Sequence, residues 1–98
     1  MKRAELTRKL NSVGKQAFVE HFELFKKHAS GQINRSKAVD ELIRLGVSNE
    51  AGAGIRVGNA KLIFEAHREA DALDMISGSG RLPASVIGEA RRLKNAIA

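Results

Sequence analysis

The sequence predicts an all-α fold, a compact bundle of four or five helices formed by a single domain over residues 1–98. Apolar residues recur at steps of three and four along most of the chain, which is the spacing of a helix with one buried face. Runs of β-branched residues with period-two alternation, the pattern of strands, are missing. Proline occurs once, so little in the chain interrupts helices.

The first helical region is expected over residues 3–29. It contains two apolar stripes at helical spacing, Leu6-Leu10-Val13-Ala17 and Phe18-Phe22-Phe25-Ala29. The segment NSVG, residues 11–14, is a possible break at which Ser12 caps a second helix. The phenylalanine spacing favours a core stripe over a platform on which bases stack. Ser30-Gly31 is expected to end the region.

A short helix is predicted in the segment NRSKAVDELIRLG, residues 34–46. Asn34 or Ser36 is suited to cap its beginning, and Gly46 is suited to the left-handed position after its last turn. Its core-facing residues are expected to be Val39, Leu42 and Ile43.

Ser48 is expected to cap a long helix, with Glu50 in its first turn, where a carboxylate suits the helix dipole. The predicted inward face of this helix comprises Ala51, Ile55, Gly58, Leu62, Ala66, Leu73 and Ile76. That assignment places Ala53 and Arg56 on the outward face. The segment SGSG, residues 77–80, is expected to end the helix.

Pro83 suits the first turn of a final helix. One side of this helix is predicted to bear Val86, Ala90, Leu93 and Ile97, and the remainder to bear Arg91, Arg92 and Lys94.

The chain is strongly basic, with 17 Lys and Arg against 11 Asp and Glu and a formal net charge of +6. This balance favours anionic partners such as nucleic acid. Residues 65–80 are the exception, because they contain one Arg and four carboxylates. This acidic segment is expected either to point away from a nucleic acid or to pair with the basic ends of the chain.

The segment SKAVDELIRLGVSNEAGAGIRVGNAKLIF, residues 36–64, resembles helix-turn-helix DNA-binding domains. The order of short helix, Leu-Gly-Val turn, serine cap and second helix is the same. In that family the N-terminal side chains of the second helix touch base edges in the major groove. The resemblance implies that Ser48, Asn49 and Arg56 contact DNA and that Lys61 touches its backbone. It implies no specific family, and it covers only this part of the chain.

The glycines of Leu45 to Lys61 permit two other interpretations. A dinucleotide-binding loop requires a preceding strand, but the preceding segment has a helical pattern. A phosphate-binding P-loop requires Gly-Lys-Ser or Gly-Lys-Thr, but Asn59 follows Gly58. Close helix packing requires small residues on one face, which Ala51, Gly54 and Gly58 supply. We therefore expect a helix-packing or dimer contact at these three residues.

The sequence predicts neither enzymatic activity nor a cofactor. There is no cysteine, and the serines lack a glycine-flanked nucleophile elbow. The pair His21 and His28 and the row His67, Asp71 and Asp74 are incomplete as metal-ligand sets. The basic start lacks the apolar run of a secretory signal, so a cytoplasmic location is expected.

The sequence thus predicts a small regulatory protein that binds nucleic acid, in particular duplex DNA, and that forms a dimer. Its contacts would be phosphate contacts from the basic ends, including Arg91, Arg92 and Lys94, and limited base contact from Asn49 and Arg56. The alternative is a protein–protein interaction module, a small adaptor or inhibitor that docks on a partner through glycine-lined and apolar helix faces.

Overall fold

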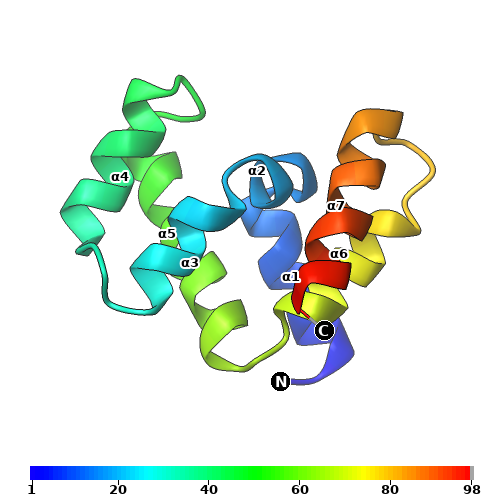
Figure 1. The fold of residues 1–98 in the computed structure, drawn as a ribbon. Helices are drawn as coiled ribbons and strands as arrows, with labels where there is room; N and C mark the ends of the chain where they lie inside the picture. Colours follow the sequence, from blue (N-terminus) through cyan, green and yellow to red (C-terminus); the bar gives the residue numbers. More distant parts are fainter. Residues whose placement is uncertain (98) are drawn as a thin grey trace.

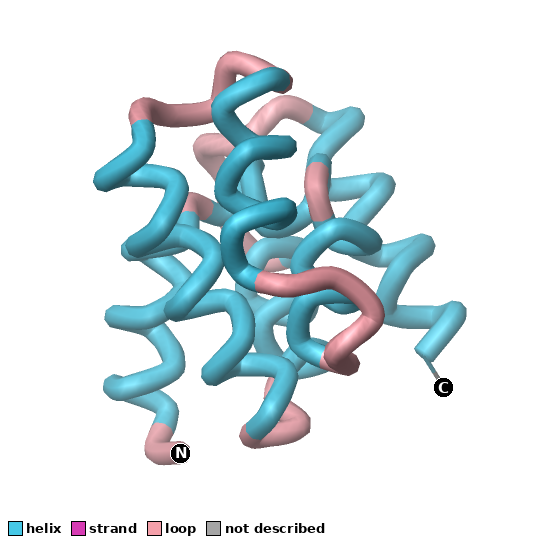
Figure 2. The backbone as a smooth tube through the Cα atoms, turned by 90° about the vertical axis from the view of Figure 1, so that its left-hand side faces the viewer, coloured by secondary structure: helices cyan, strands magenta, loops and turns pink. Residues whose placement is uncertain are grey.

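A computed structural model describes residues 1–97 and confirms the all-α class (Figure 1). In this range it contains seven helices and no strand (Figure 2). The helices are α1 (Arg3–Val13), α2 (Lys15–Glu20), α3 (Phe22–Ala29), α4 (Arg35–Arg44), α5 (Glu50–Glu65), α6 (Glu69–Ser77) and α7 (Ala84–Ile97). The expected four or five helices are too few, because two of the predicted helical regions are divided.

The first division lies between α1 and α2, where the break expected at NSVG is confirmed. Gly14 has a φ of 92°, which a residue with a side chain rarely adopts. Ser12 does not cap α2, because its hydroxyl donates to the carbonyl of Arg8 at 3.1 Å within α1. A further bend at His21, with a φ of −117°, separates α2 from α3.

The second division interrupts the predicted long helix after Glu65. His67 has a φ of 56° and is the one non-glycine residue with a positive φ among residues 1–97. The N–H of His67 donates to the carbonyl of Phe64, and the N–H of Arg68 donates to that of Ile63. These two bonds form the Schellman ending of a helix, and the chain then starts α6 in a new direction.

The α4–turn–α5 unit follows the sequence prediction closely. The side chain of Asn34 accepts a hydrogen bond from the N–H of Lys37 at 2.8 Å and caps α4. Gly46 has the predicted left-handed backbone, with a φ of 75°. The cap of α5 is Asn49, which accepts from the N–H of Gly52 at 2.8 Å. The prediction that Ser48 caps this helix is therefore wrong by one residue.

Figure 1 shows α1 and α2 in the middle of the molecule, with α4 and α5 on one side and α6 and α7 on the other. Helix α5 packs against α1, α3 and α4, and α6 packs against α7. Both ends of the described chain lie at the same end of the molecule. None of the helices described here has the length and apolar character that crossing a bilayer requires.

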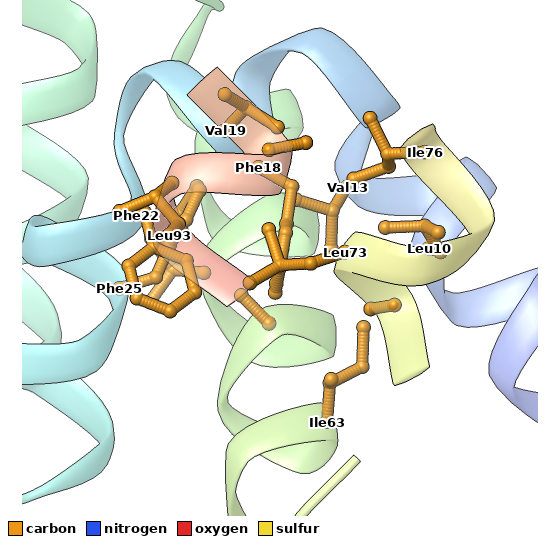
Figure 3. Close-up of a cluster of buried hydrophobic side chains, with 14 of the residues drawn as sticks. Leu10, Val13, Phe18, Val19, Phe22, Phe25, Ile63, Leu73, Ile76 and Leu93 are labelled. Carbon is orange, nitrogen blue, oxygen red and sulfur yellow. The ribbon is translucent and has the colours of Figure 1, made fainter. Parts of the chain in front are cut away.

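The core joins all seven helices, and Figure 3 shows most of its large side chains. Phe18 lies at its centre, with its ring 5.7 Å from that of Phe22 and 5.8 Å from that of Phe64. Phe18, Phe22 and Phe25 are all buried, which confirms the predicted core stripe. Burial of one such side chain contributes about 1.5–3 kcal/mol to stability, so the three rings together contribute several kcal/mol.

The predicted inward face of the long helix is confirmed at Leu73 and Ile76, which lie in α6 and are buried, but it is wrong over α5. The buried residues of α5 are Ala53, Val57, Ala60 and Ile63, whereas Ala51 is exposed, Ile55 is 57% exposed and Leu62 is 45% exposed. Two small residues, Ala53 and Ala60, allow neighbouring helices to approach closely on the buried side. Both sides of α5 are apolar or small, so the periodicity alone did not identify the side that packs.

Smaller corrections apply to α4 and α7. Leu42 is buried as predicted, but Ala38 occupies the second buried position of α4 and Ile43 is exposed. In α7 the predicted face is confirmed at Val86, Ala90 and Leu93. Ile97 at the end of that helix is 41% exposed and extends beyond the core.

Candidate functional site

Three connecting segments meet at the end of the molecule opposite the termini (Figure 1). They are the α1–α2 junction, the α4–α5 turn and the α6–α7 loop, and a cleft of about 800 Å³ lies between them. The polar residues of its lining are Asn11, Lys15, Gln16, Glu20, His21, Arg56, Ser79 and Arg81. We call this region the three-segment cleft.

The three-segment cleft has an excess of positive charge. Lys15 comes from the start of α2, Arg56 from α5 and Arg81 from the α6–α7 loop. Glu20 is the one carboxylate in the lining, and its oxygen accepts a hydrogen bond from the Gln16 side chain at 2.7 Å. Three cations from separate parts of the chain thus face one open cleft, an arrangement that attracts anions.

Arg56 lies in this cleft for a reason that the sequence prediction missed. It is not on the outward face of α5, because it is part-buried and donates through Nη1 to the carbonyl of Val13. The guanidinium also lies against Gly14, where an added Cβ would be 2.6 Å from Nη1. This hydrogen bond satisfies a carbonyl at the end of α1 and fixes the arginine beside the α1–α2 junction.

The other residues predicted to contact DNA on α5 do not join Arg56. Asn49 lines a different hollow, together with Arg35, Asp40 and Glu50. The Ser48 hydroxyl lies over Gly52, where an added Cβ would be 2.0 Å from Oγ. Lys61 lies near the buried His28. The structure therefore separates Asn49 and Arg56, the two side chains from which base contact was expected.

The predicted cationic cluster of α7 is partly paired. Arg92 donates to Glu89 at 2.9 Å, and Lys94 donates to Asp74 at 2.6 Å. Lys94 and its neighbour Arg91 line one hollow that also includes Asp74. The acidic segment therefore pairs with the basic C-terminal end, which is one of the two arrangements that its charge suggested.

Lys15 and Arg81 are site residues that sequence reasoning did not identify. Neither belongs to a motif, and each lies far along the chain from Arg56. The sequence offers only an indirect signal for these two residues: Lys15 follows the break at Gly14, and Arg81 follows the SGSG segment. Residues at such connections lie on the surface and are common in binding sites.

A side chain from α4 covers two residues of the predicted helix-packing or dimer contact. The Arg35 guanidinium lies across Gly54 and Gly58 and donates from Nη2 to the Gly54 carbonyl at 3.3 Å. An added Cβ would be 3.0 Å from this guanidinium at Gly54 and 3.5 Å at Gly58. Within residues 1–97 the three predicted contact residues, Ala51, Gly54 and Gly58, therefore lie at the surface or under Arg35, and no other helix covers Ala51.

Comparison with models of known protein families, with curated proteins and with solved structures finds no match to this chain. Among residues 1–97, no group of three or more His, Cys, Asp or Glu side chains is placed to hold a metal ion. The row predicted at His67, Asp71 and Asp74 is divided, because His67 lies in the turn before α6.

Proposed function

We propose that this protein binds nucleic acid through the phosphate backbone, with the three-segment cleft as the point of contact. The observation that supports this proposal is the convergence of Lys15, Arg56 and Arg81 from three segments of the chain. The formal net charge of +6 adds long-range attraction toward a polyanion. Side chains with hydrogen-bond donors, such as Asn11, Gln16 and Ser79, complete a lining suited to phosphate oxygens.

The proposed binding discriminates weakly between sequences. Base reading by a helix-turn-helix requires donors and acceptors on the outward face of its second helix. The outward face of α5 presents Ala51, Ile55, Gly58 and Leu62 instead. Affinity then comes mainly from phosphate contacts and the release of counterions, so it depends steeply on salt concentration.

The test compares two double variants that remove equal charge. Lys15→Ala/Arg81→Ala removes two cations of the cleft, and Lys26→Ala/Lys27→Ala removes two exposed cations of α3 that do not line it. Binding to one generic duplex is measured by fluorescence anisotropy across a salt series. The cleft variant is expected to lower the slope of log K against log salt by about 2, because each phosphate contact contributes about 1. The α3 variant is expected to change the slope little.

Two outcomes would overturn the proposal. Equal losses for the two double variants would leave only diffuse attraction and remove the cleft as the site. Absence of binding by the parent protein at low salt would remove nucleic-acid binding altogether. Arg56 is left unchanged in both variants because its bond to the Val13 carbonyl also supports the fold.

A second candidate function is protein–protein interaction. The observation in its favour is the exposed apolar face of α5, where Ile55 is 57% and Leu62 is 45% exposed. A salt-insensitive complex with a protein partner would support this function, because an apolar contact releases no counterions.

A further inference from the structure

Two smaller hollows continue the three-segment cleft along the sides of α6. The first lies between α1 and the end of α6, and it shares Asn11 and Lys15 with the cleft. The second lies between α6 and α7, and it shares Asp74 and Gly78 with the first. Because neighbouring hollows share residues, the three form one continuous depression. We call its cationic side chains the basic track, which comprises Arg3, Lys15, Arg56, Arg81, Arg91 and Lys94.

The net positive charge of the protein is concentrated in this depression. Its lining contains the six cations of the basic track and two carboxylates, Glu20 and Asp74, which gives a net charge of +4. The rest of the chain contains eleven cations and nine carboxylates, and it contributes only +2 to the formal net charge of +6. The depression is therefore the part of the surface that attracts a polyanion most strongly.

The carboxylates of α6 do not cancel this charge. Asp74 accepts a hydrogen bond from Lys94 at 2.6 Å, and this bond, together with the more distant charge of Arg3, holds the pKa of Asp74 below its usual range. Asp71, one turn earlier in α6, is paired with Arg68 at 2.6 Å. Both carboxylates beside the track are thus neutralised by cations of the protein itself.

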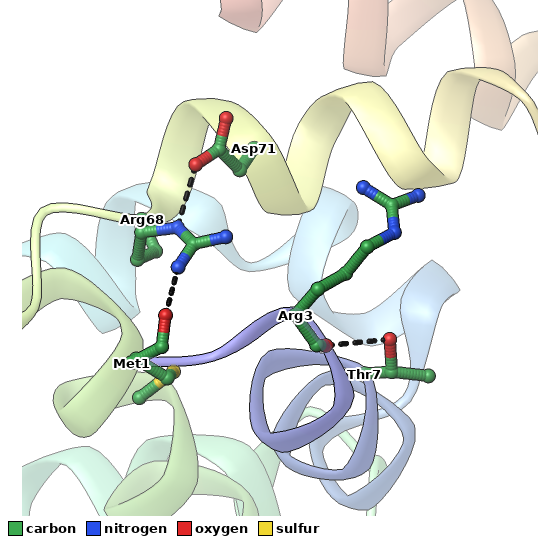
Figure 4. A network of polar contacts seen from close by, with 5 residues as sticks. All are labelled: Met1, Arg3, Thr7, Arg68 and Asp71. Atoms are coloured by element: carbon green, nitrogen blue, oxygen red, sulfur yellow. Dashed lines mark hydrogen bonds and ion pairs between the residues drawn. The ribbon is translucent and has the colours of Figure 1, made fainter.

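Four cations of the basic track remain available to a ligand. Figure 4 shows Arg3 extending from the start of α1 toward α6. Among residues 1–97 no ion pair forms at Arg3, Lys15, Arg81 or Arg91. The distance from Arg3 to Lys15 along α1 is about 18 Å at about 1.5 Å per residue. A ligand that meets both ends must be extended, and a duplex with a rise of about 3.4 Å per base pair covers this distance with about five base pairs.

The depression lacks the aromatic side chains on which single-stranded nucleic acid stacks. The chain contains no Tyr or Trp, and its phenylalanines belong to the core. Proteins that bind single strands combine a basic groove with aromatic platforms for the bases, and this surface offers only the first. A duplex keeps its bases stacked inside and presents its phosphates outward, so cations and hydrogen-bond donors are sufficient to hold it.

We propose that the basic track holds the backbone of a nucleic-acid duplex over at least about five base pairs, with Arg3 and Arg91 as phosphate contacts in addition to those of the three-segment cleft. Lys94 serves the track by neutralising Asp74, which lies between Arg3 and the end of α7 in the lining. This inference rests on the proposed function and deepens it, because it names the form of the nucleic acid and extends the site along α6.

The first test concerns the form of the nucleic acid. Fluorescence anisotropy compares a duplex of about 15 base pairs with one of its strands at the same salt concentration. The parent protein is expected to bind the duplex at least roughly tenfold more tightly. The single strand has the lower charge density, and no aromatic side chain of the depression compensates through stacking.

The second test concerns the extent of the site. Arg3→Ala/Arg91→Ala is expected to lower the slope of log K against log salt for the duplex by about 2, as the cleft variant Lys15→Ala/Arg81→Ala does. Arg3→Lys/Arg91→Lys retains both charges and should retain most of the slope, which a merely structural role of the arginines would not produce. The α3 variant Lys26→Ala/Lys27→Ala is the control with equal charge removed away from the track. Circular dichroism verifies folding, which is expected because Arg3 and Arg91 are exposed.

The possible failures are distinguishable. Equal affinity for the single strand and the duplex would overturn the assignment of a duplex. A parent-like slope in Arg3→Ala/Arg91→Ala, with the expected loss in the cleft variant, would confine the contact to the three-segment cleft and leave the proposed function intact. Equal losses in the cleft and α3 variants, or no binding by the parent protein, would remove the proposed function and this inference with it.

Discussion

At the scale of single residues, His28 is the least ordinary side chain in the core. It is 7% exposed, and its Nδ1 has no hydrogen-bond partner among residues 1–97. Burial lowers the pKa of His28, the charges of Lys61 and Arg35 lower it further, and Glu65 opposes them. The imidazole therefore stays neutral in the folded protein under conditions that protonate it in the unfolded chain.

This difference predicts a loss of stability in mild acid. The pKa of histidine in an unfolded chain is about 6.5, so below that pH the unfolded state binds a proton that the folded state excludes. The free energy of unfolding is expected to fall as pH decreases from 7.5 to 5. His28→Leu removes this proton and should flatten the decline. Urea unfolding of both proteins across this pH range measures the effect, and identical slopes would contradict the assignment to His28.

At the scale of helices, the chain uses the same ending after α3, α4 and α5, with glycine at two of the positions and histidine at the third. Gly31 after α3, Gly46 after α4 and His67 after α5 all occupy the left-handed position of a Schellman ending, with φ values of 81°, 75° and 56°. The left-handed conformation costs a residue with a Cβ about 1–2 kcal/mol, and glycine adopts it freely. The ending at His67 is therefore the strained one of the three.

Substitutions at His67 and Gly46 should change the free energy of unfolding with opposite signs. His67→Gly is expected to raise the free energy of unfolding by about 0.5–1 kcal/mol, because relief of strain exceeds the added entropy of the unfolded chain. Gly46→Ala is expected to lower it by about 1 kcal/mol, although no atom lies within 4 Å of the added Cβ. Thermal and urea unfolding measure both. A loss of stability in His67→Gly would show that the imidazole contributes more than its backbone strain.

At the scale of the whole molecule, Arg68 connects segments from distant parts of the chain. It donates to the backbone carbonyl of Met1 at the start of the chain, and its Nε is 2.6 Å from the carboxylate of Asp71 in α6 (Figure 4). The Arg68 side chain is 25% exposed, and it lies where α5 ends and α6 begins. One side chain thus fixes the N-terminus to the junction between the two sides of the bundle.

Arg68→Ala is therefore expected to destabilise the protein by about 1–3 kcal/mol, the usual cost of leaving a charged hydrogen-bonding partner unmatched. Arg92→Ala is the matched control, because Arg92 pairs with Glu89 on the exposed surface of α7, where solvent screens the pair and it should contribute little to stability. Guanidinium unfolding of the two variants compares them. Equal losses would mean that the contact with Met1 adds nothing to stability.

The sequence by itself determined the all-α class, several helix ends and much of the core. These features depend on local chemistry: Gly46 and Gly14 have backbone conformations that favour glycine, Asn34 caps its own helix, and the phenylalanine stripe has no polar alternative. Each of these signals is contained within a few neighbouring residues. They did not reveal the end of α5, because His67 is a residue that rarely takes a left-handed backbone.

Only the tertiary structure decided which side of α5 is buried and which residues form the candidate site. Apolar and small residues occur on both sides of α5, so its periodicity permitted either rotation, and packing against α1, α3 and α4 selected Ala53, Val57 and Ala60. With α5 in this rotation, Arg56 does not lie on the expected outward face and instead donates a hydrogen bond to the carbonyl of Val13. The same rotation leaves Ile55 and Leu62 exposed. Lys15, Arg56 and Arg81 face one cleft because three connections meet at one end of the bundle, and that meeting depends on how whole helices pack.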